Sequence, residues 1–337
     1  MYKKLGDQTV KFENPPRIKG FYSIVGEKEG QGPLKNFFDM IVDDAKFGEN
    51  SWEKAESKFI ETAMSNAVTN AEISMKDIEY VFAGDLINQC IASNYAVRQI
   101  GRPFFGLYGA CSTMAESLSL AAMCIDGGFA KNVIAATSSH FCASEKQFRF
   151  PLEYGGERPP TSQWTVTGAG AVVLSNDGQG PFVDYITTGK VIDLGITDMN
   201  NMGAAMAPAA ADTIISFFKD TEKSFDDYDL VITGDLGSLG SELLKDLLTQ
   251  NGFTVSSKLQ DCGVKIFDAE LQDVHSGGSG CGCSASVLTS YILKSMEKGI
   301  YKKVLFVATG ALMNPIITQQ GESIPCIAHL VSLGTEV

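Results

Sequence analysis

The chain has 337 residues, of which 44% are hydrophobic and 20% are charged, the composition of a folded protein with a large core. Its formal net charge is −13, from 27 basic and 40 acidic side chains. This acidity argues against nucleic acid as a partner, because phosphate binding needs clustered Lys and Arg. No apolar run reaches the roughly 18–20 residues of a membrane-spanning helix, and none follows the early lysines. We therefore expect no transmembrane helix, no signal peptide, and synthesis in the cytoplasm.

Short apolar runs of strand length alternate with helical patterns along the chain. The predicted strands are 78–84, 132–139, 229–234 and 303–310. The predicted helices are 53–71, 113–126, 204–219, 238–250 and 284–298. This alternation is typical of an α/β protein with largely parallel, buried strands.

Two sequence blocks occur twice in the same order. VFAGDL at 81–86 returns as VITGDL at 231–236, and the segment 109–139 returns at 280–310, an offset of 171 residues. Each copy of the longer block reads as a glycine-bearing turn, a helix, a glycine and a strand. The repeats predict a duplicated α/β unit. We place the halves at 1–178 and 179–337, which meet in the turn-rich stretch SNDGQGP.

Eight cysteines are too sparse and irregular for a disulfide framework. Cys281 and Cys283 form a CxC pair with Cys262 upstream, but the chain has only three histidines and no second ligand pair at metal spacing. We therefore expect reduced, mostly buried thiols and no metal site.

Cys111 lies within GLYGACSTMAESLSLA, directly before a predicted amphipathic helix. Thr113 and Glu116 have capping-box spacing, which predicts that the helix begins at or just after Thr113. The turn at a helix start carries a partial positive charge and free N–H groups, which stabilise a thiolate or another anion. A buried, inert cysteine is the competing interpretation, because free cysteine is among the most buried residue types.

The duplicated halves and the Gly-Ala-Cys turn resemble the thiolase superfamily, which includes the β-ketoacyl synthases with a nucleophilic cysteine. Four stretches resemble one branch, the stage V sporulation protein AD family. They are GEKEGQGPL, ACSTMAESLSLA, RPPTSQWTVTGAG and the glycine- and cysteine-rich loop after His275. This resemblance implies a duplicated thiolase fold with five layers, αβαβα.

The resemblance also implies a role in endospore-forming bacteria. Members of this family take part in moving dipicolinic acid into the developing spore and out at germination. They work with membrane proteins of the same channel system and lie peripherally at the spore inner membrane. Superfamily members commonly form homodimers through a strand and loop near the nucleophile turn, so a homodimer is expected here.

A condensing enzyme needs a general base or an oxyanion donor beside its cysteine. The position that best matches the superfamily's histidine in the second half is Gly234, and only His275 corresponds to a catalytic histidine. No asparagine occurs between His275 and Ser286. His140 and His329 lie outside any motif and are expected to be structural. Cys111 and His275 are therefore interpreted as vestiges of a catalytic set, which favours a protein that is not an enzyme and leaves activity open.

Dipicolinate is a flat pyridine with two carboxylates, and it needs N–H donors or arginines around an apolar slot. The predicted ligand-binding residues are Cys111, Ser112, Arg158, His275, Gly277, Gly278 and Gly280, with Arg102 and Arg149 as further candidates for charge. No cofactor is expected, and calcium enters only as the chelate of the ligand. Two alternatives stay open: an acyltransferase or condensing enzyme that forms an acyl-enzyme at Cys111, and an interaction module for membrane partners.

Overall fold

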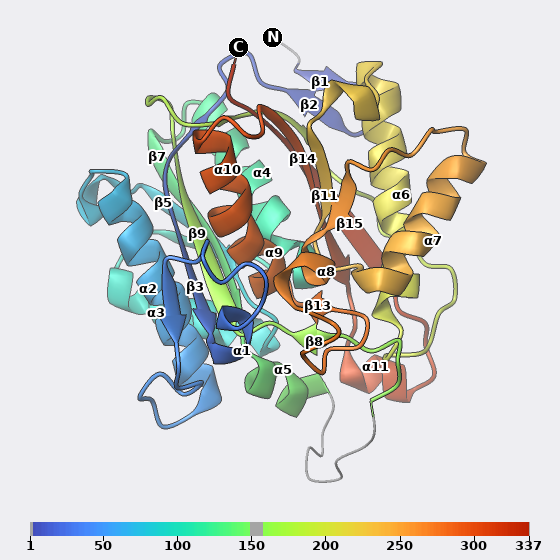
Figure 1. The fold of residues 1–337 in the computed structure, drawn as a ribbon. Coiled ribbons are helices and arrows are strands. Elements are labelled where there is room, and N and C mark those ends of the chain that lie inside the picture. The colour runs from blue at the N-terminus through green and yellow to red at the C-terminus, as the bar shows by residue number, and fades with distance from the viewer. Residues whose placement is uncertain (1–2, 149–157, 337) are drawn as a thin grey trace.

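The computed structural model describes residues 3–148 and 158–336. Ten strands follow one another in a mixed sheet, five from each half of the chain (Figure 1). The first half contributes, in spatial order, β3 (Arg17–Gly26), β9 (Gly168–Ser175), β7 (Asn132–Ser139), β5 (Tyr80–Gly84) and β6 (Phe104–Gly106). The second half contributes β10 (Phe182–Thr187), β15 (Cys326–Gly334), β14 (Lys303–Ala311), β11 (Leu230–Thr233) and β12 (Leu259–Asp261). The two runs meet where Arg17 pairs with Phe182.

The two halves have the same topology. In the first half β9 is antiparallel to both β3 and β7, and β7, β5 and β6 are parallel. In the second half β15 is antiparallel to both β10 and β14, and β14, β11 and β12 are parallel. The shared order confirms the predicted duplication. The boundary between residues 178 and 179 stays a prediction, and it falls in the connection from β9 to β10.

The repeat extends further upstream than the two sequence blocks. A 3₁₀ turn at Met75–Asp77 is closed by a capping box between Ser74 and Asp77, just before β5. The turn at Phe225–Asp227 has the same capping box, between Ser224 and Asp227, just before β11. The two boxes lie 150 residues apart, the offset of VFAGDL and VITGDL.

Helices form three further layers around the strands, which gives the predicted order αβαβα (Figure 1). The outer face of the first half is covered by α2 (Trp52–Asn70) and α3 (Ile91–Ile100), and that of the second half by α6 (Met202–Thr221) and α7 (Gly237–Gln250). The middle layer holds α4 (Thr113–Asp126), α9 (Cys281–Val287) and α10 (Leu293–Glu297). Since α4 contacts both β7 and β14, this layer joins the two halves.

The core separates into three main clusters. One lies in the middle layer, one lies under α2 and α3, and one lies under α6 and α7. Along β7, Val133 and Ala135 enter the central cluster, whereas Ile134 and Ala136 enter the cluster under α2 and α3. Alternate side chains of a strand point to opposite faces, so a strand buried on both faces is apolar throughout. This is the physical reason why the predicted strands read as unbroken apolar runs.

Shorter elements complete the fold. They are β1 (Lys4–Leu5), β2 (Thr9–Lys11), β4 (Met40–Val42), β8 (Trp164–Thr165), β13 (Gly278–Ser279), α1 (Glu27–Gly30), α5 (Phe141–Phe148), α8 (Cys262–Ile266) and α11 (Pro315–Gln319). The pair β8–β13 forms a separate small parallel sheet next to the middle layer. The helix predicted at 284–298 begins earlier, at Cys281, and passes through a π-helical turn at Leu288–Ile292 before it ends at Glu297.

Candidate functional site

Cys111 lies in a 3₁₀ turn, Ala110–Ser112, directly before α4, as the sequence predicted. Hydroxyl groups close this turn: Ser112 Oγ donates to Gly109 O at 2.6 Å, and Thr113 Oγ1 donates to Ala110 O at 2.6 Å. The predicted capping box was wrong. Ser112 is the N-cap residue without a side-chain cap, because the Thr113 hydroxyl is used inside the turn and accepts from Gly109 N.

The side chain that faces Cys111 from the second half is Asp235, which follows β11. The Cys111 thiol donates to the Asp235 carboxylate. That carboxylate also accepts from Gly280 N at 2.8 Å and from Thr309 Oγ1 at 2.9 Å. The Ser279 hydroxyl donates to it at 3.2 Å. Asp235 is completely buried, and its contacts join the turn before α4 to the turn before α9.

Burial and the neighbouring acid keep Cys111 protonated. Burial raises the pKa of the Cys111 thiol well above its usual range, and the nearby Asp235 carboxylate raises it further. Burial also raises the pKa of Asp235 itself. Of the two interpretations of Cys111, burial favours the protonated, buried cysteine over a thiolate, because desolvation opposes the effect of the helix dipole.

The predicted match at Gly234 missed the facing side chain by one residue. A Cβ at Gly234 would lie 3.1 Å from Ala308 Cα, so this position packs tightly against β14 and a side chain there would crowd the strand. Asp235 is the middle residue of the repeated Gly-Asp-Leu motif, and its counterpart in the first half is Asp85. The repeated motif therefore contained a signal for Asp235. The comparison with the superfamily's histidine position pointed to the neighbouring Gly234 instead.

His275 and Arg158 lie together, but next to Asp273 and not next to Cys111. His275 Nε2 is 3.3 Å from Asp273 Oδ1, and Arg158 Nη2 donates to the same oxygen at 3.3 Å. The Arg158 guanidinium covers the Trp164 ring at 4.7 Å. Because Trp164 and Thr165 are adjacent in β8, their side chains point to opposite faces. Thr165 lines the cavity at Cys111, whereas Trp164 belongs to this outer cluster.

Backbone N–H groups of the glycine loop already have partners within the chain. Gly277 N donates to Val274 O at 3.1 Å, and Gly280 N donates to Asp235. Gly278 lies in β13, paired with Trp164. The ligand-binding roles predicted for this loop, and those of Ser112, Arg158 and His275, stay predictions.

The other candidates lie apart from Cys111. His140 and His329 are buried: His140 Nε2 lies 2.7 Å from Ala45 O, and burial lowers the pKa of His329 to about 4. Arg102 is half-buried in the connection before β6, and its Nε has no hydrogen-bond partner within the described residues. Arg149 lies outside the described residues.

A narrow cavity of about 50 Å³ opens onto Cys111. Its walls are largely apolar, with polar groups interspersed. The apolar walls come from Leu86, Tyr108, Ala110, Phe148, Met202, Ala311 and Met313, and the polar groups from Ser144, Glu145, Thr165 and Ser279. The cavity is thus bounded by both halves, and Cys111 is one of its lining residues.

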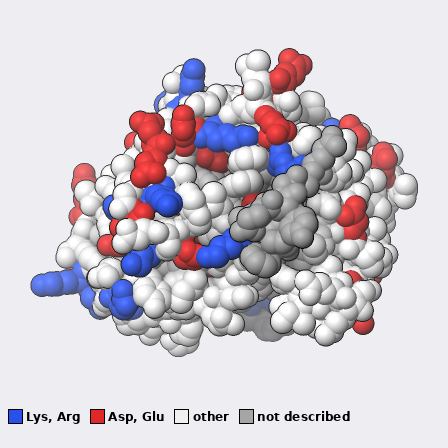
Figure 2. Space-filling view, turned by 90° about the horizontal axis from the view of Figure 1, so that it is seen from below, with Lys and Arg blue, Asp and Glu red and all other residues white. Residues whose placement is uncertain are grey.

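Surface charge and metal-ligand geometry add little to this picture. Basic and acidic side chains are interspersed over the end of the molecule at the bottom of Figure 1 (Figure 2). Within residues 3–148 and 158–336, no three His, Cys, Asp or Glu side chains are grouped to hold a metal ion. All eight cysteines are free, and six of them are buried. No helix in the described part of the chain is both long and apolar enough to cross a bilayer.

Comparison with solved structures defines the class of fold. The chain is similar to 3-oxoacyl-[acyl-carrier-protein] synthase III from Aquifex aeolicus VF5, with a TM-score of 0.57 and 13% identity, over 95% of this chain and 99% of that one. It is also similar to human mitochondrial 3-ketoacyl-CoA thiolase, with a TM-score of 0.60 and 12% identity, over 97% and 100% of the two chains. The fold is therefore a duplicated thiolase fold, as predicted.

The family follows from the sequence itself. The model of the stage V sporulation protein AD family matches residues 6–334. Stage V sporulation protein AD of Bacillus subtilis (strain 168) is 47% identical over 327 residues, which cover 97% of this chain and 96% of that protein. The chain belongs to the stage V sporulation protein AD family, which supports a role in sporulation.

Proposed function

We propose that this chain is a non-catalytic binding protein for dipicolinate in the transport system of the spore, acting in sporulation and germination. The observation that carries the proposal is the aspartate opposite Cys111. A condensing enzyme activates its cysteine with a base that takes the thiol proton. Here the pKa values of Cys111 and Asp235 are both raised, so the buried site favours a protonated thiol and a protonated carboxyl group over a thiolate beside an ionised base. The thiolase fold is thereby retained with a site suited to binding and poorly suited to acyl transfer.

The cavity suits a planar aromatic ligand once it widens. Its volume of about 50 Å³ is far below the roughly 300–1,000 Å³ of ligand pockets, so entry has to displace side chains such as Phe148 and Met313. The carboxylate of Glu145 lines the cavity, and it opposes a free dianion. A calcium chelate of dipicolinate reverses this effect, because Ca²⁺ prefers carboxylate oxygens. We therefore expect the chelate to bind more tightly than the free ligand.

The proposed partners are membrane proteins of the same channel system, which would hold the chain peripherally at the spore inner membrane. We also propose a homodimer. An apolar surface that includes Phe82, Phe105, Met123 and Phe129 lies beside β6, the last strand of the first half. Phe105 is 51% exposed and Phe129 is 75% exposed. An exposed apolar patch next to an unpaired strand edge is typical of an association surface.

Isothermal titration with dipicolinate, with and without calcium, tests the binding proposal. Cys111→Ala and Ala311→Phe change the cavity, and Ala311→Phe fills it. His275→Ala changes the outer cluster around Asp273 and serves as the matched variant. Loss of binding in the cavity variants alone supports the site at Cys111, whereas loss in His275→Ala alone moves it to the outer cluster. An absence of heat in every condition would refute dipicolinate binding.

Acyl transfer through Cys111 is the second candidate function, because the cysteine keeps its place in the turn before α4. Intact-mass measurement after incubation with an acyl-coenzyme A distinguishes the two. An acyl adduct that disappears in Cys111→Ala would support the enzyme, and its absence at long incubation times would support the binding protein.

A further inference from the structure

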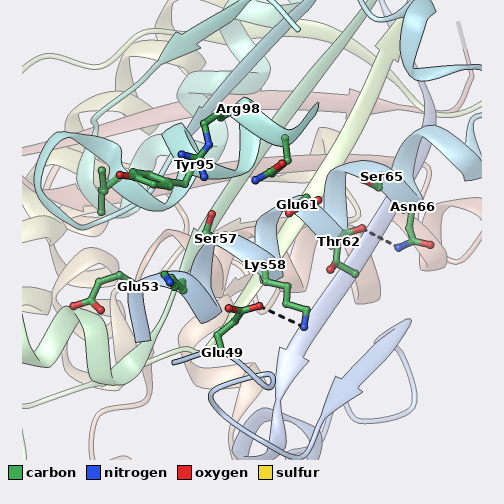
Figure 3. Close-up of a pocket in the computed structure, with 13 residues that line it drawn as sticks. Glu49, Glu53, Ser57, Lys58, Glu61, Thr62, Ser65, Asn66, Tyr95 and Arg98 are labelled. Carbon is green, nitrogen blue, oxygen red and sulfur yellow. Dashed lines mark hydrogen bonds and ion pairs between the residues drawn. The ribbon is translucent and has the colours of Figure 1, made fainter. Parts of the chain in front are cut away.

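A polar groove of about 800 Å³ lies between α2 and α3, on the outer helical layer of the first half (Figure 3). Side chains of Lys54, Lys58 and Glu61 on α2 form one wall. Tyr95 and Arg98 on α3 form the other. The groove is separate from the cavity at Cys111, and no residue lines both.

The duplication provides an internal comparison for this groove. At an offset of 150 residues, α2 and α3 correspond to α6 and α7. Lys54, Lys58 and Glu61 correspond to Ala204, Pro208 and Ala211, listed in the same order. The second half therefore has small residues at the positions where the first half has long charged side chains.

Small residues let α6 and α7 pack closely. A Cβ at Gly203 on α6 would lie 2.4 Å from Leu236 O and 3.1 Å from Gly240 N on α7, so only glycine fits there. The position equivalent to Gly203 in the first half is Glu53. The outer positions of the two helical pairs thus differ in size and charge. The helices of the first pair are still in contact, since Ser57 Oγ on α2 donates to Ala92 O on α3 at 2.9 Å, and the long charged side chains line the groove outside that contact.

The groove also presents two charged side chains, Arg98 and Glu61, that form no ion pair within the described residues. The Arg98 guanidinium stacks on the Tyr95 ring at 4.4 Å, and within the described residues it forms no ion pair. Glu61, on the opposite wall, forms no hydrogen bond or ion pair in the part of the chain that the structure describes. Lys58 is 3.7 Å from Glu49, an ion pair at the edge of the contact range. Tyrosine and arginine are enriched in the energetic centres of protein interfaces.

We propose that the groove between α2 and α3 is a docking site for a helix of another protein of the sporulating cell. The lining residues of α2 run from Glu53 to Asn66, which corresponds to about 20 Å of helix and so to three or four turns of a partner helix. Charge complementarity requires an acidic side chain on that helix for Arg98 and a basic one for Glu61. Such a pair, one turn apart, faces the same side of a helix. The proposal holds whether or not dipicolinate binds at Cys111.

Site-specific photo-crosslinking in sporulating cells tests this docking site. A photoreactive phenylalanine analogue replaces Tyr95 in the full-length chain, and mass spectrometry identifies the cross-linked peptide. We expect one protein adduct through a helical segment that bears the acidic and basic pair. Arg98→Glu should lower its yield at least about tenfold, the effect expected of a hot-spot residue. In the Arg98→Glu background, replacing the acidic residue of the partner helix by a basic one should restore the cross-linking yield.

Lys245→Glu, on α7 of the second half, is the matched charge reversal and should leave the yield unchanged. An adduct to a second copy of this chain or to lipid would overturn the proposal, as would the absence of any adduct. A protein adduct that is insensitive to Arg98→Glu, or not restored by the reciprocal change, would overturn it too. Titration of the same variants with dipicolinate separates this test from that of the proposed function, because both variants lie away from the cavity.

Discussion

Replacing Asp235 tests whether the buried carboxyl group organises the site through hydrogen bonds. Asp235→Ala leaves Gly280 N unpaired in a buried position, which destabilises by about 1–3 kcal/mol, and removes two hydroxyl hydrogen bonds of about 1 kcal/mol each. We expect the free energy of unfolding to fall by about 3–5 kcal/mol. Urea denaturation followed by circular dichroism at pH 7 measures this change.

Asp235→Asn is the matched variant. The amide oxygen can replace the carboxylate oxygen that accepts from Gly280 N and Ser279, and the Thr309 hydroxyl can rotate to accept from the amide NH₂. We therefore expect a loss of about 1 kcal/mol or less. The hydrogen-bond argument would be refuted if the alanine variant lost less than about 1 kcal/mol, or if both variants lost the same amount.

The pH dependence of this pair has a defined sign. Burial raises the folded-state pKa of Asp235, so its contribution to stability is full below the unfolded pKa and is lost as the pH rises through the folded value. Asparagine does not ionise. Relative to the original chain, Asp235→Asn should therefore gain stability as the pH increases.

Three further predictions concern other parts of the molecule. Cys111 should react with iodoacetamide more slowly than the half-buried Cys142, because burial and Asp235 keep the Cys111 thiol protonated. Peptide mass spectrometry over time measures the two labelling rates. Faster labelling of Cys111 would contradict the site geometry. Burial raises the pKa of Asp261 to about 7, so stability should fall between pH 5 and pH 7, by up to about 2–3 kcal/mol from this group. Urea denaturation across that range would disprove this contribution if the slope were the same in Asp261→Asn. Phe105→Glu should shift the sedimentation of a dimer towards the monomer, whereas Leu271→Glu, at an 85% exposed position outside the apolar surface, should not; equal effects of the two would argue against that surface.

Most of the candidate site required the three-dimensional structure. The sequence identified Cys111 and its turn before a helix, because small residues and an amphipathic pattern are local signals. It did not identify Asp235 as the partner, since a contact between residues 124 positions apart depends on how the two halves pack. For the same reason the sequence suggested one site for His275 and Cys111, although the loop directs the His275 side chain towards Asp273.

The fold was determined largely by the sequence alone. Apolar runs of strand length, helical periodicity and two repeated blocks indicated a duplicated α/β protein, because strands buried on both faces must be apolar and each half must satisfy the same packing. Electrostatics at the site was decided only by the tertiary structure. A helix start favours a thiolate, but complete burial next to a carboxylate favours the thiol, and neither burial nor that neighbour is encoded within a few residues of Cys111. The open groove between α2 and α3 depends on the structure in the same way, since charged residues on a helix become a groove only when a second helix lies beside them.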